Sequence, residues 1–292
     1  MQTIKLNNGI EMPILGFGVF QVSPDECERC VLDAISVGYR LIDTAQAYYN
    51  EEGVGNAIAK CGVPRNELFL TTKVWITNAG EEKATASIDE SLRKLRTDYI
   101  DLLLIHQPFS DYTGTWRAME KTVREGKVRA IGLSNFYPDR FVDMAEYAEI
   151  KPAVNQLKTN VFSQQWDAGA EMKPYGTHIM AWGPLAQGDP DLQTNPILND
   201  LAEKYGKTTQ QIALRYLLDR DIIAIPKSTH IDRMKQNLDV FDFTLTQAEM
   251  ESICLLDKPA DFRWSHRNPE LVKYLWNYDK QFNPNNKVSN RL

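Results

Sequence analysis

Hydrophobic positions in this chain alternate between short unbroken runs and longer segments in which they recur every three or four residues. Unbroken runs of this length are typical of buried strands, and the wider spacing is typical of amphipathic helices. The clearest helical pattern spans residues 81–96, where Ala84, Ile88 and Leu92 share one side. The predicted strands are residues 14–19, 40–43, 68–74, 100–106, 128–133, 153–156, 178–182 and 222–225.

Eight strands that alternate with helices predict a parallel sheet with right-handed crossovers. A closed barrel and an open doubly wound sheet both satisfy this alternation. Eight units without a linker rich in Pro or Gly favour a (β/α)8 TIM barrel, formed as one domain by residues 1–292. Residues 1–13 predict an N-terminal β-hairpin that turns at Asn8-Gly9. Residues 258–292, rich in Asn, Pro, Trp and charge, predict an irregular tail over the barrel mouth.

Three of the predicted helices begin with a capping box, in which the first and fourth residues exchange hydrogen bonds between side chain and backbone. The boxes are residues 23–26, 208–211 and 246–249. Pro24 follows the cap of the earliest box, at the first helical position, where no N–H is needed. These boxes predict where three helices start.

The composition limits the classes of partner. The chain has a formal net charge of −6 at pH 7, which argues against general affinity for nucleic acid or anionic membranes. A ligand with a phosphate would therefore need a local basic site. No segment approaches the roughly 20 apolar residues of a membrane span, and the first residues lack the apolar core of a signal peptide. We expect a cytoplasmic protein that binds neither membranes nor nucleic acid.

Four cysteines are too few for a disulfide scaffold in a chain of 292 residues. Cys27 and Cys30 form a C-x-x-C pattern, but both lie on the apolar stripe of the helix predicted after residue 23. A redox centre would need an exposed thiolate, and a zinc site would need two more ligands at matching spacing. The pattern favours two small buried side chains.

Three predicted strands end in ionisable side chains, which are costly to bury without a partner or a function. These side chains are Asp43, Lys73 and His106, and Tyr48 follows Asp43 after one short loop. In a barrel of this type the active site lies at the carboxyl ends of the strands. The four residues are therefore expected at one mouth.

The chemistry of these four residues is complementary. Asp43 would keep a buried Lys73 charged. The ammonium would stabilise the phenolate of Tyr48 and lower the pKa of this residue from its free value near 10, which favours proton donation at neutral pH. A neutral His106 would orient a carbonyl group by hydrogen bonding. The sequence therefore predicts a proton-donating site around Tyr48.

Three motifs resemble the signature of the aldo-keto reductase family. They are Gly38-Tyr39-Arg40-Leu41-Ile42-Asp43-Thr44-Ala45 with Tyr48, Asn50, Glu51, Glu52 and Gly55; Ile131-Gly132-Leu133-Ser134-Asn135-Phe136; and Ile225-Pro226-Lys227-Ser228 with Arg233 and Asn237. The resemblance extends from about residue 4 to residue 257. It implies a (β/α)8 barrel and a catalytic tetrad of Asp43, Tyr48, Lys73 and His106, with Tyr48 as the general acid.

The resemblance also implies NADPH as the cofactor, bound in extended form at the barrel mouth without a Rossmann loop. The near-miss Gly16-Phe17-Gly18 lacks the third glycine of that loop, because Gln21 stands there. Arg233 offers a planar fork to a 2′-phosphate, and Lys227 offers a point charge. The implied cofactor residues are Ser134, Asn135 and Gln156 at the carboxamide, Trp182 stacked on the nicotinamide, Lys227, Ser228 and Arg233 at the 2′-phosphate, Gln236 at the adenine, and Gly183, Leu185 and Asn237 along its length.

The chain departs from the family pattern around the expected cofactor. Trp182-Gly183-Pro184-Leu185 stands where many relatives have Tyr-Ser-Pro-Leu, and it is similar to bacterial members that reduce diketo-sugar acids. After Gln156 the family usually continues Ile-Glu-x-His-Pro, whereas this chain has Leu157-Lys158-Thr159-Asn160-Val161. Phe20 replaces a common tryptophan. These changes bear on substrate preference and leave the tetrad intact.

The predicted substrate pocket is aromatic. Its candidates are Phe20, Tyr49, Trp75 and Trp264, and Trp75 either lines the pocket or packs behind its strand. His266 in the tail is a further candidate for contact with substrate. The histidines outside the tetrad are His178, His230 and His266. Their spacing does not suit a metal ion, so no metal is expected.

These observations predict an NADPH-dependent reductase of small aldehydes and ketones, with dicarbonyls and keto-sugar acids as plausible substrates, that works as a monomer. A Schiff-base aldolase is an alternative, because barrels often place a lysine such as Lys73 at a strand end. That lysine must be neutral to attack, whereas pairing with Asp43 holds it charged. A cofactor-holding binding or redox-sensing subunit is a third possibility, against which the complete tetrad weighs.

Overall fold

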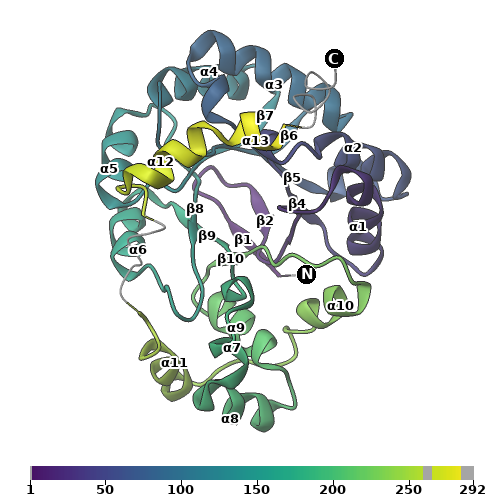
Figure 1. The fold of residues 1–292 in the computed structure, drawn as a ribbon, viewed down its shortest axis with the longest axis vertical. Helices are drawn as coiled ribbons and strands as arrows, with labels where there is room; N and C mark the ends of the chain where they lie inside the picture. Colours follow the sequence, from purple (N-terminus) through teal and green to yellow (C-terminus); the bar gives the residue numbers. More distant parts are fainter. Residues whose placement is uncertain (1, 259–264, 284–292) are drawn as a thin grey trace.

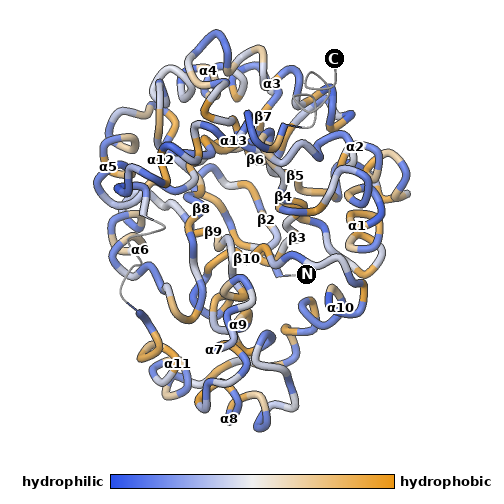
Figure 2. The backbone as a smooth tube through the Cα atoms, viewed as in Figure 1, coloured by the Kyte–Doolittle hydropathy of each residue, from blue (hydrophilic) through white to orange (hydrophobic). Residues whose placement is uncertain are grey.

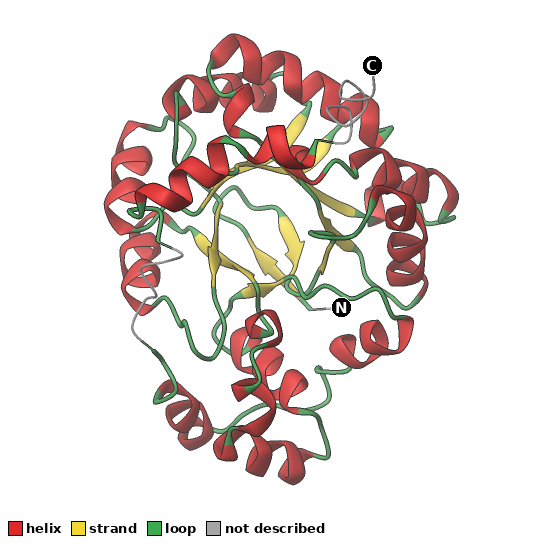
Figure 3. Ribbon diagram, in the orientation of Figure 1, coloured by secondary structure: helices red, strands yellow, loops and turns green. Residues whose placement is uncertain are grey.

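An eight-stranded sheet, surrounded by helices, forms the centre of the molecule in the computed structural model, which describes residues 2–258 and 265–283 (Figures 1 and 3). The strands pair in chain order, and every pair is parallel. They are β3 (Phe17–Gly18), β4 (Leu41–Asp43), β5 (Phe69–Val74), β6 (Ile100–Ile105), β7 (Val128–Ser134), β8 (Val154–Lys158), β9 (His178–Trp182) and β10 (Ile223–Ala224). All eight predicted strands are confirmed to within a few residues.

The first and last strands meet and close the sheet into a barrel. Leu15 forms a parallel bridge with Ala224, and three backbone hydrogen bonds join the two edges: Ala224 N to Ile14 O at 2.9 Å, Gly16 N to Ala224 O at 2.8 Å and Gly18 N to Pro226 O at 3.1 Å. A Cβ on Gly16 would lie 2.4 Å from Leu41 Cγ, so this glycine serves the packing of the barrel. The (β/α)8 barrel predicted from the sequence is confirmed.

The predicted hairpin covers the amino-terminal end of the barrel. Strands β1 (Thr3–Lys5) and β2 (Glu11–Pro13) pair antiparallel. Asn8 donates to the carbonyl of Arg129 at the start of β7, and His178 at the start of β9 lies 3.1 Å from the carbonyl of Lys5. The opposite, carboxyl-terminal mouth is therefore the end left for the site.

Helices surround the strands, and their hydrophobic positions recur along each of them as the sequence pattern requires (Figure 2). The helices are α1 (Pro24–Ser36), α2 (Glu51–Lys60), α3 (Glu81–Leu95), α4 (Tyr112–Arg124), α5 (Pro138–Tyr147), α6 (Trp166–Met172), α7 (Asp191–Thr194), α8 (Pro196–Tyr205), α9 (Thr209–Leu218), α10 (Ile231–Leu238), α11 (Gln247–Cys254), α12 (Pro269–Trp276) and α13 (Tyr278–Phe282). Short 3₁₀ turns are η1 (Gln46–Tyr48), η2 (Arg65–Glu67), η3 (Ile76–Asn78), η4 (Lys173–Tyr175) and η5 (Ala186–Gly188).

Two of the three predicted capping boxes are present. Thr208 and Thr246 each accept from the backbone three residues on, and the reciprocal bonds from Gln211 and Glu249 are also formed. The box at Ser23 is wrong, because the Ser23 hydroxyl points to the Glu26 carboxylate at 3.2 Å and caps no backbone N–H. Helix α1 starts with proline at its first position instead.

Cys27 and Cys30 lie on the buried face of α1, as predicted, and neither forms a disulfide. Burial raises the pKa of the Cys27 thiol to about 12, which makes it a poor nucleophile. None of the helices in the described ranges combines the length and the apolar character that crossing a bilayer demands.

The described part of the tail is helical, although the sequence analysis expected it to be irregular. Asn268 caps α12 by accepting from the Glu270 amide, and Pro269 occupies the first helical position. Figure 1 shows α12 and α13 in yellow, crossing over the carboxyl-terminal mouth of the barrel. The predicted position over the mouth is correct, and the predicted lack of regular structure is wrong.

Candidate active site

A buried ion pair lies at the centre of the mouth. Lys73 Nζ lies 2.6 Å from Asp43 Oδ1, and both side chains are at most 3% exposed. Lys73 also donates to the Thr44 carbonyl at 2.8 Å, and Gln156 Nε2 donates to Asp43 Oδ2 at 2.9 Å. Burial lowers the pKa of Lys73 and raises that of Asp43, while the attraction between the two charges opposes both shifts. Two charges so deeply buried are stable only because they satisfy each other.

Tyr48 reaches this pair from η1, the short turn that follows β4. Its hydroxyl lies 3.4 Å from Lys73 Nζ, and the ammonium lies 4.9 Å from the centre of its ring. The next residue, Tyr49, has a left-handed backbone with φ of 57°, which turns the chain sharply into α2. Asn50 braces the turn by donating to the carbonyls of Val19 and Val22, at 2.9 and 3.1 Å. The position of the phenol is therefore fixed by the loop.

The pKa of Tyr48 differs from the expectation. The sequence predicts that Lys73 lowers this pKa, but burial, followed by the negative charge of Asp43 and the neighbouring Tyr278, raises the pKa of Tyr48 well above 10. The expectation was wrong because it counted the cation and left out burial and the carboxylate that neutralises it. Tyr48 is therefore a protonated phenol at neutral pH.

His106 faces Tyr48 across the mouth. The edge of its ring meets Tyr48 at a centroid distance of 5.5 Å, and Trp75 packs edge-on behind it at 5.0 Å. Burial, with the positive charge of Lys73 and the neighbouring His266, lowers the pKa of His106 well below 6.5, so the imidazole is neutral. Its Nδ1 is buried and has no hydrogen-bond partner in the described chain. The four residues of the predicted tetrad thus lie together around one small space.

A polar group suited to an amide lies next to the tetrad, where β7, β8 and β9 end. Asn135, with a left-handed φ of 64°, donates to the His106 carbonyl at 3.1 Å and accepts from the Trp182 indole at 3.0 Å. Its amide also lies 3.1 Å from the Ser134 hydroxyl. Gln156 joins this group through its backbone carbonyl, which accepts from the Asn135 N–H at 2.9 Å. All the residues expected at the carboxamide of a nicotinamide are therefore adjacent.

The residues predicted for the far end of a cofactor surround the start of α10. Lys227 and Arg233 are exposed, and neither has a carboxylate partner in the described chain. Ser228 is buried and forms hydrogen bonds with the backbone of His230, the residue before the helix. Gln236 is exposed and Asn237 is buried on α10 itself. Gly183, with φ of 63°, and Leu185 lie half-buried on the loop after β9.

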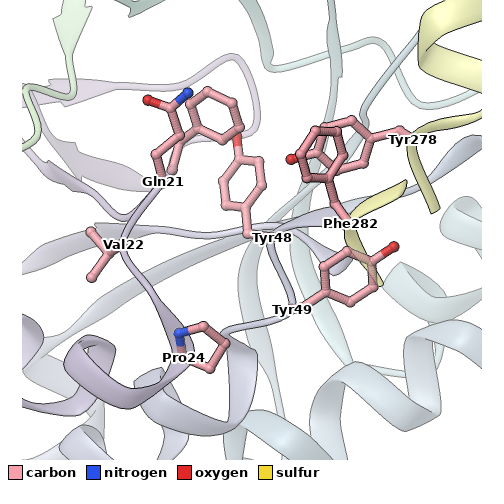
Figure 4. A pocket seen from close by; sticks show the side chains of 8 residues that line it. Gln21, Val22, Pro24, Tyr48, Tyr49, Tyr278 and Phe282 are labelled. Atoms are coloured by element: carbon pink, nitrogen blue, oxygen red, sulfur yellow. The ribbon is translucent and has the colours of Figure 1, made fainter. Parts of the chain in front are cut away.

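Aromatic side chains from the loops and from the tail line a pocket of about 230 Å³ beside Tyr48 (Figure 4). Phe20 and Tyr49 line it, as predicted, and the Phe20 ring lies 5.0 Å from that of Tyr48. The tail contributes Tyr278 and Phe282, neither of which was predicted. Trp75 is not part of this lining and packs between His106 and Tyr278. The predicted Trp264 lies outside the described residues.

Asp279 and His266 are two of the residues that fix the tail to the mouth. Asp279 accepts from the Tyr49 hydroxyl and from Thr77, the latter at 2.7 Å. His266 lies 2.7 Å from the side-chain oxygen of Gln107, the residue after His106. The sequence analysis considered His266 but not Gln107 or Asp279. The apolar spacing of Leu271, Leu275 and Tyr278 was the signal available for the tail helices.

Comparison with known proteins identifies the family. A model described as the aldo/keto reductase family matches residues 14–258. Glyoxal reductase of Bacillus subtilis is 45% identical over 258 residues, which cover 88% of this chain and 93% of that protein.

Solved structures agree in fold and length. An aldo-keto reductase from a Medee basin deep-sea metagenome library has a TM-score of 0.88 at 42% identity, covering 91% of this chain and 98% of its own. An aldo-keto reductase of Bombyx mori, in complex with NADP, has a TM-score of 0.85 at 37% identity, covering 94% and 96%. The resemblance seen in the sequence is confirmed, and the chain is an oxidoreductase that belongs to the aldo/keto reductase family.

Proposed function

We propose that this protein uses NADPH to reduce small aldehydes and ketones to alcohols, with Tyr48 as the proton donor. The observation that supports this most directly is the phenol of Tyr48, held 3.4 Å from a buried ammonium and opposite a neutral imidazole. A carbonyl oxygen between the two rings would meet one O–H donor and one ring nitrogen. The similarity to a glyoxal reductase supports small dicarbonyl compounds as substrates.

The residues of the mouth suit an NADPH molecule at both of its ends. The amides of Asn135 and Gln156 and the Ser134 hydroxyl offer donors and acceptors to a carboxamide, and the Trp182 ring offers a face for stacking. Lys227 and Arg233 are free to bind a 2′-phosphate, since no carboxylate in the described chain holds them. When bound, the cofactor supplies a hydride to the carbonyl carbon.

The side chains supply the proton and stabilise the charge. As the carbonyl oxygen gains negative charge, the Tyr48 O–H bond breaks and its proton passes to that oxygen. The phenolate that remains is stabilised by the ammonium of Lys73, which Asp43 keeps charged. His106, neutral and buried, positions the carbonyl and is not the source of the proton. A proton from solvent then restores Tyr48.

The same ion pair argues against the Schiff-base alternative. An aldolase lysine attacks as a neutral amine, whereas Lys73 lies 2.6 Å from a buried carboxylate and donates to a carbonyl as well. Treatment with borohydride in the presence of a carbonyl compound is expected to leave no adduct on Lys73.

The decisive test is Tyr48→Phe, assayed by oxidation of NADPH with methylglyoxal, sugar-derived dicarbonyls and aromatic aldehydes. We expect the turnover number to fall by about 10²–10⁴, because a positioned proton donor contributes a factor of that size. The dissociation constant for NADPH, followed by quenching of tryptophan fluorescence, is expected to change by less than about threefold. A variant that reduces these substrates at the normal rate would remove Tyr48 from the mechanism.

A further inference from the structure

A second and larger pocket opens on the other side of the mouth. It has a volume of about 910 Å³ and is lined by the loops that follow β6, β7, β8 and β9, together with described tail residues on both sides of 259–264. We call it the lateral pocket. Its lining includes aromatic side chains, among them Phe109 and Tyr137, and polar ones, among them Asn135, Lys158 and His266.

The lateral pocket adjoins the tetrad through Asn135. This residue lines the pocket, donates to the carbonyl of His106 at 3.1 Å and accepts from the Trp182 indole. Lys158 is paired with Trp182 in the register of β8 and β9, and it lies two residues after Gln156 on the same face of the strand. A molecule bound next to His106 would therefore reach the lateral pocket with its far end.

Most carboxylates that line the lateral pocket already have partners. Asp139 lies 3.5 Å from Arg267. Asp189 accepts from the backbone N–H of Asp191 at 3.0 Å, and Asp257 accepts from that of Gln164 at 2.9 Å. Each of these three carboxylates is engaged in a local contact, and the four acids of the described lining are matched by four cations.

One further acid and three cations complete the charged lining. Asp167 lies in the first turn of α6, where the helix amides favour an acid. Lys258 is bound to Asp191 at 2.6 Å. Arg140 makes one long contact, 3.4 Å, with a tyrosine hydroxyl. Lys158 is half-buried, and its ammonium has no partner in the described chain.

The charge of Lys158 is also a departure from the family. The position two residues after Gln156 usually carries glutamate in aldo-keto reductases, so the sign of the charge is reversed here. The Lys158 side chain lines the pocket and its ammonium is not held by a carboxylate of the described chain, so it is available to an anion. An anion in the lateral pocket would give this ammonium a partner of opposite charge.

We infer that the lateral pocket binds the anionic end, carboxylate or phosphate, of the carbonyl substrate, and that Lys158 determines this preference. The inference rests on the proposed function and adds the class of substrate to it. A neutral dicarbonyl would use the tetrad alone, whereas a keto acid or a phosphorylated aldehyde would also bind Lys158. Anionic carbonyl compounds are then the preferred substrates.

The test compares two pairs of substrates that differ in charge; the members of the first pair are also close in shape, and those of the second differ by one phosphate group. The carboxylate pair is 4-carboxybenzaldehyde and 4-formylbenzamide, and the phosphate pair is glyceraldehyde 3-phosphate and glyceraldehyde. In at least one pair we expect kcat/KM to be about tenfold higher for the anionic member than for the neutral one. Whichever pair shows this difference identifies the bound group as a carboxylate or a phosphate. This preference is expected to fall as salt is raised.

Three variants test whether Lys158 causes the preference for anionic substrates. Lys158→Gln is expected to remove most of the preference through KM, with kcat and the neutral substrate unchanged, and Lys158→Arg is expected to retain it. The matched control is Lys258→Gln, which removes a cation from the same pocket whose charge is already bound by Asp191. For the carboxylate pair, calorimetry with the alcohol product 4-(hydroxymethyl)benzoate gives a binding readout that is independent of turnover.

Each contrary outcome has a distinct meaning. Equal rates for both members of both pairs in the unmodified enzyme would overturn the role of the lateral pocket and leave the reductase intact. A preference that survives Lys158→Gln, or a variant that loses both members of a pair equally, would overturn the role of Lys158. If the unmodified enzyme reduces none of the four compounds with NADPH, the proposed function itself fails, and this inference fails with it.

Discussion

The mouth of the barrel holds two groups of charges that differ in burial and in pairing. The charges of Lys73 and Asp43 are fully buried, 2.6 Å apart, and each has a second hydrogen bond. The charges of Lys227 and Arg233, at the start of α10, are exposed and unpaired in the described chain. The first group has its partners within the protein, whereas the second group has no carboxylate partner in the described chain and is proposed to bind the 2′-phosphate of NADPH.

This difference matches the roles proposed for the two groups. A group that tunes a proton donor must keep a fixed geometry and protonation state, and burial with a dedicated partner provides both. A group that captures a phosphate from water must be accessible, because a cation already paired to a carboxylate gains little from a second anion. The two groups therefore respond differently to substitution, salt and pH.

The largest expected contrast is between Lys73→Met and Lys227→Met. Lys73→Met leaves Asp43 buried without its counter-ion, so we expect a loss of about 3–5 kcal/mol in the free energy of unfolding and a fall in turnover of at least about 100-fold. Lys227→Met is expected to leave the unfolding free energy within about 0.5 kcal/mol. Urea denaturation and NADPH oxidation measure both.

A double variant sharpens the contrast at the buried pair. Adding Asp43→Asn to Lys73→Met removes the isolated charge, so part of the lost stability is expected to return while turnover stays low. If Lys73→Met is as stable as the unmodified protein, the buried ion pair of Lys73 and Asp43 does not contribute to the stability of the fold.

The second contrast is between cofactors. Arg233→Ala is expected to raise the dissociation constant for NADPH by about tenfold or more and to change that for NADH by less than about twofold, because only NADPH has a 2′-phosphate. Fluorescence titration measures both constants. Equal losses for the two cofactors would place the 2′-phosphate elsewhere.

Salt gives a third and smaller contrast. Exposed charges are screened over a Debye length of about 10 Å at 0.1 M salt, and buried pairs are screened much less. Between 0.05 and 0.5 M NaCl we expect the NADPH dissociation constant to rise about fivefold. Turnover at saturating NADPH should change little, since the ion pair beneath Tyr48 is inaccessible. A salt effect on turnover as large as that on binding would contradict this division.

The smallest expected effect concerns pH and one histidine of the tail, His266. Burial lowers the pKa of His266 to about 4, against about 6.5 in the unfolded chain. Between these values the unfolded chain binds a proton that the folded chain does not, so stability is lost as pH falls from 6.5 towards 4. From pH 7 to 5.5, His266→Gln should reduce this loss by about 1 kcal/mol or less, and Lys227→Gln should not alter it. Urea denaturation gives the free energy of unfolding at each pH. If it depends on pH in the same way in the unmodified protein and in both variants, the prediction for His266 is wrong.

Local patterns in the sequence were sufficient for most of the architecture. The strands could be predicted because each is short and rich in apolar residues, and three of them deliver Asp43, Lys73 and His106 to one end. The capping boxes at Thr208 and Thr246 depend on residues three apart, which a sequence displays directly. Where Ser23 had the right spacing but Pro24 started the helix, the pattern failed.

Features that depend on distant segments could not be predicted in this way. The contact of Tyr278 with Trp75, and that of His266 with Gln107, join residues more than 150 positions apart. The pKa of Tyr48 depends on how deeply the phenol is buried and on the balance of all nearby charges, which no spacing reveals. The tail appeared irregular because its Asn, Pro and charged residues are also those that cap short helices.

The seam between β3 and β10 bears on how the barrel opens. These strands have two residues each, whereas β5 and β6 have six, so fewer hydrogen bonds have to break for local opening at the seam. Amide protons there are expected to exchange with solvent before those of the central strands. The bond from Gly18 to Pro226 lies immediately before Lys227, so a ligand held by Lys227 would slow that exchange. We therefore expect NADPH, if Lys227 binds it as proposed, to protect the Gly18 amide from exchange and to stabilise the seam between β3 and β10.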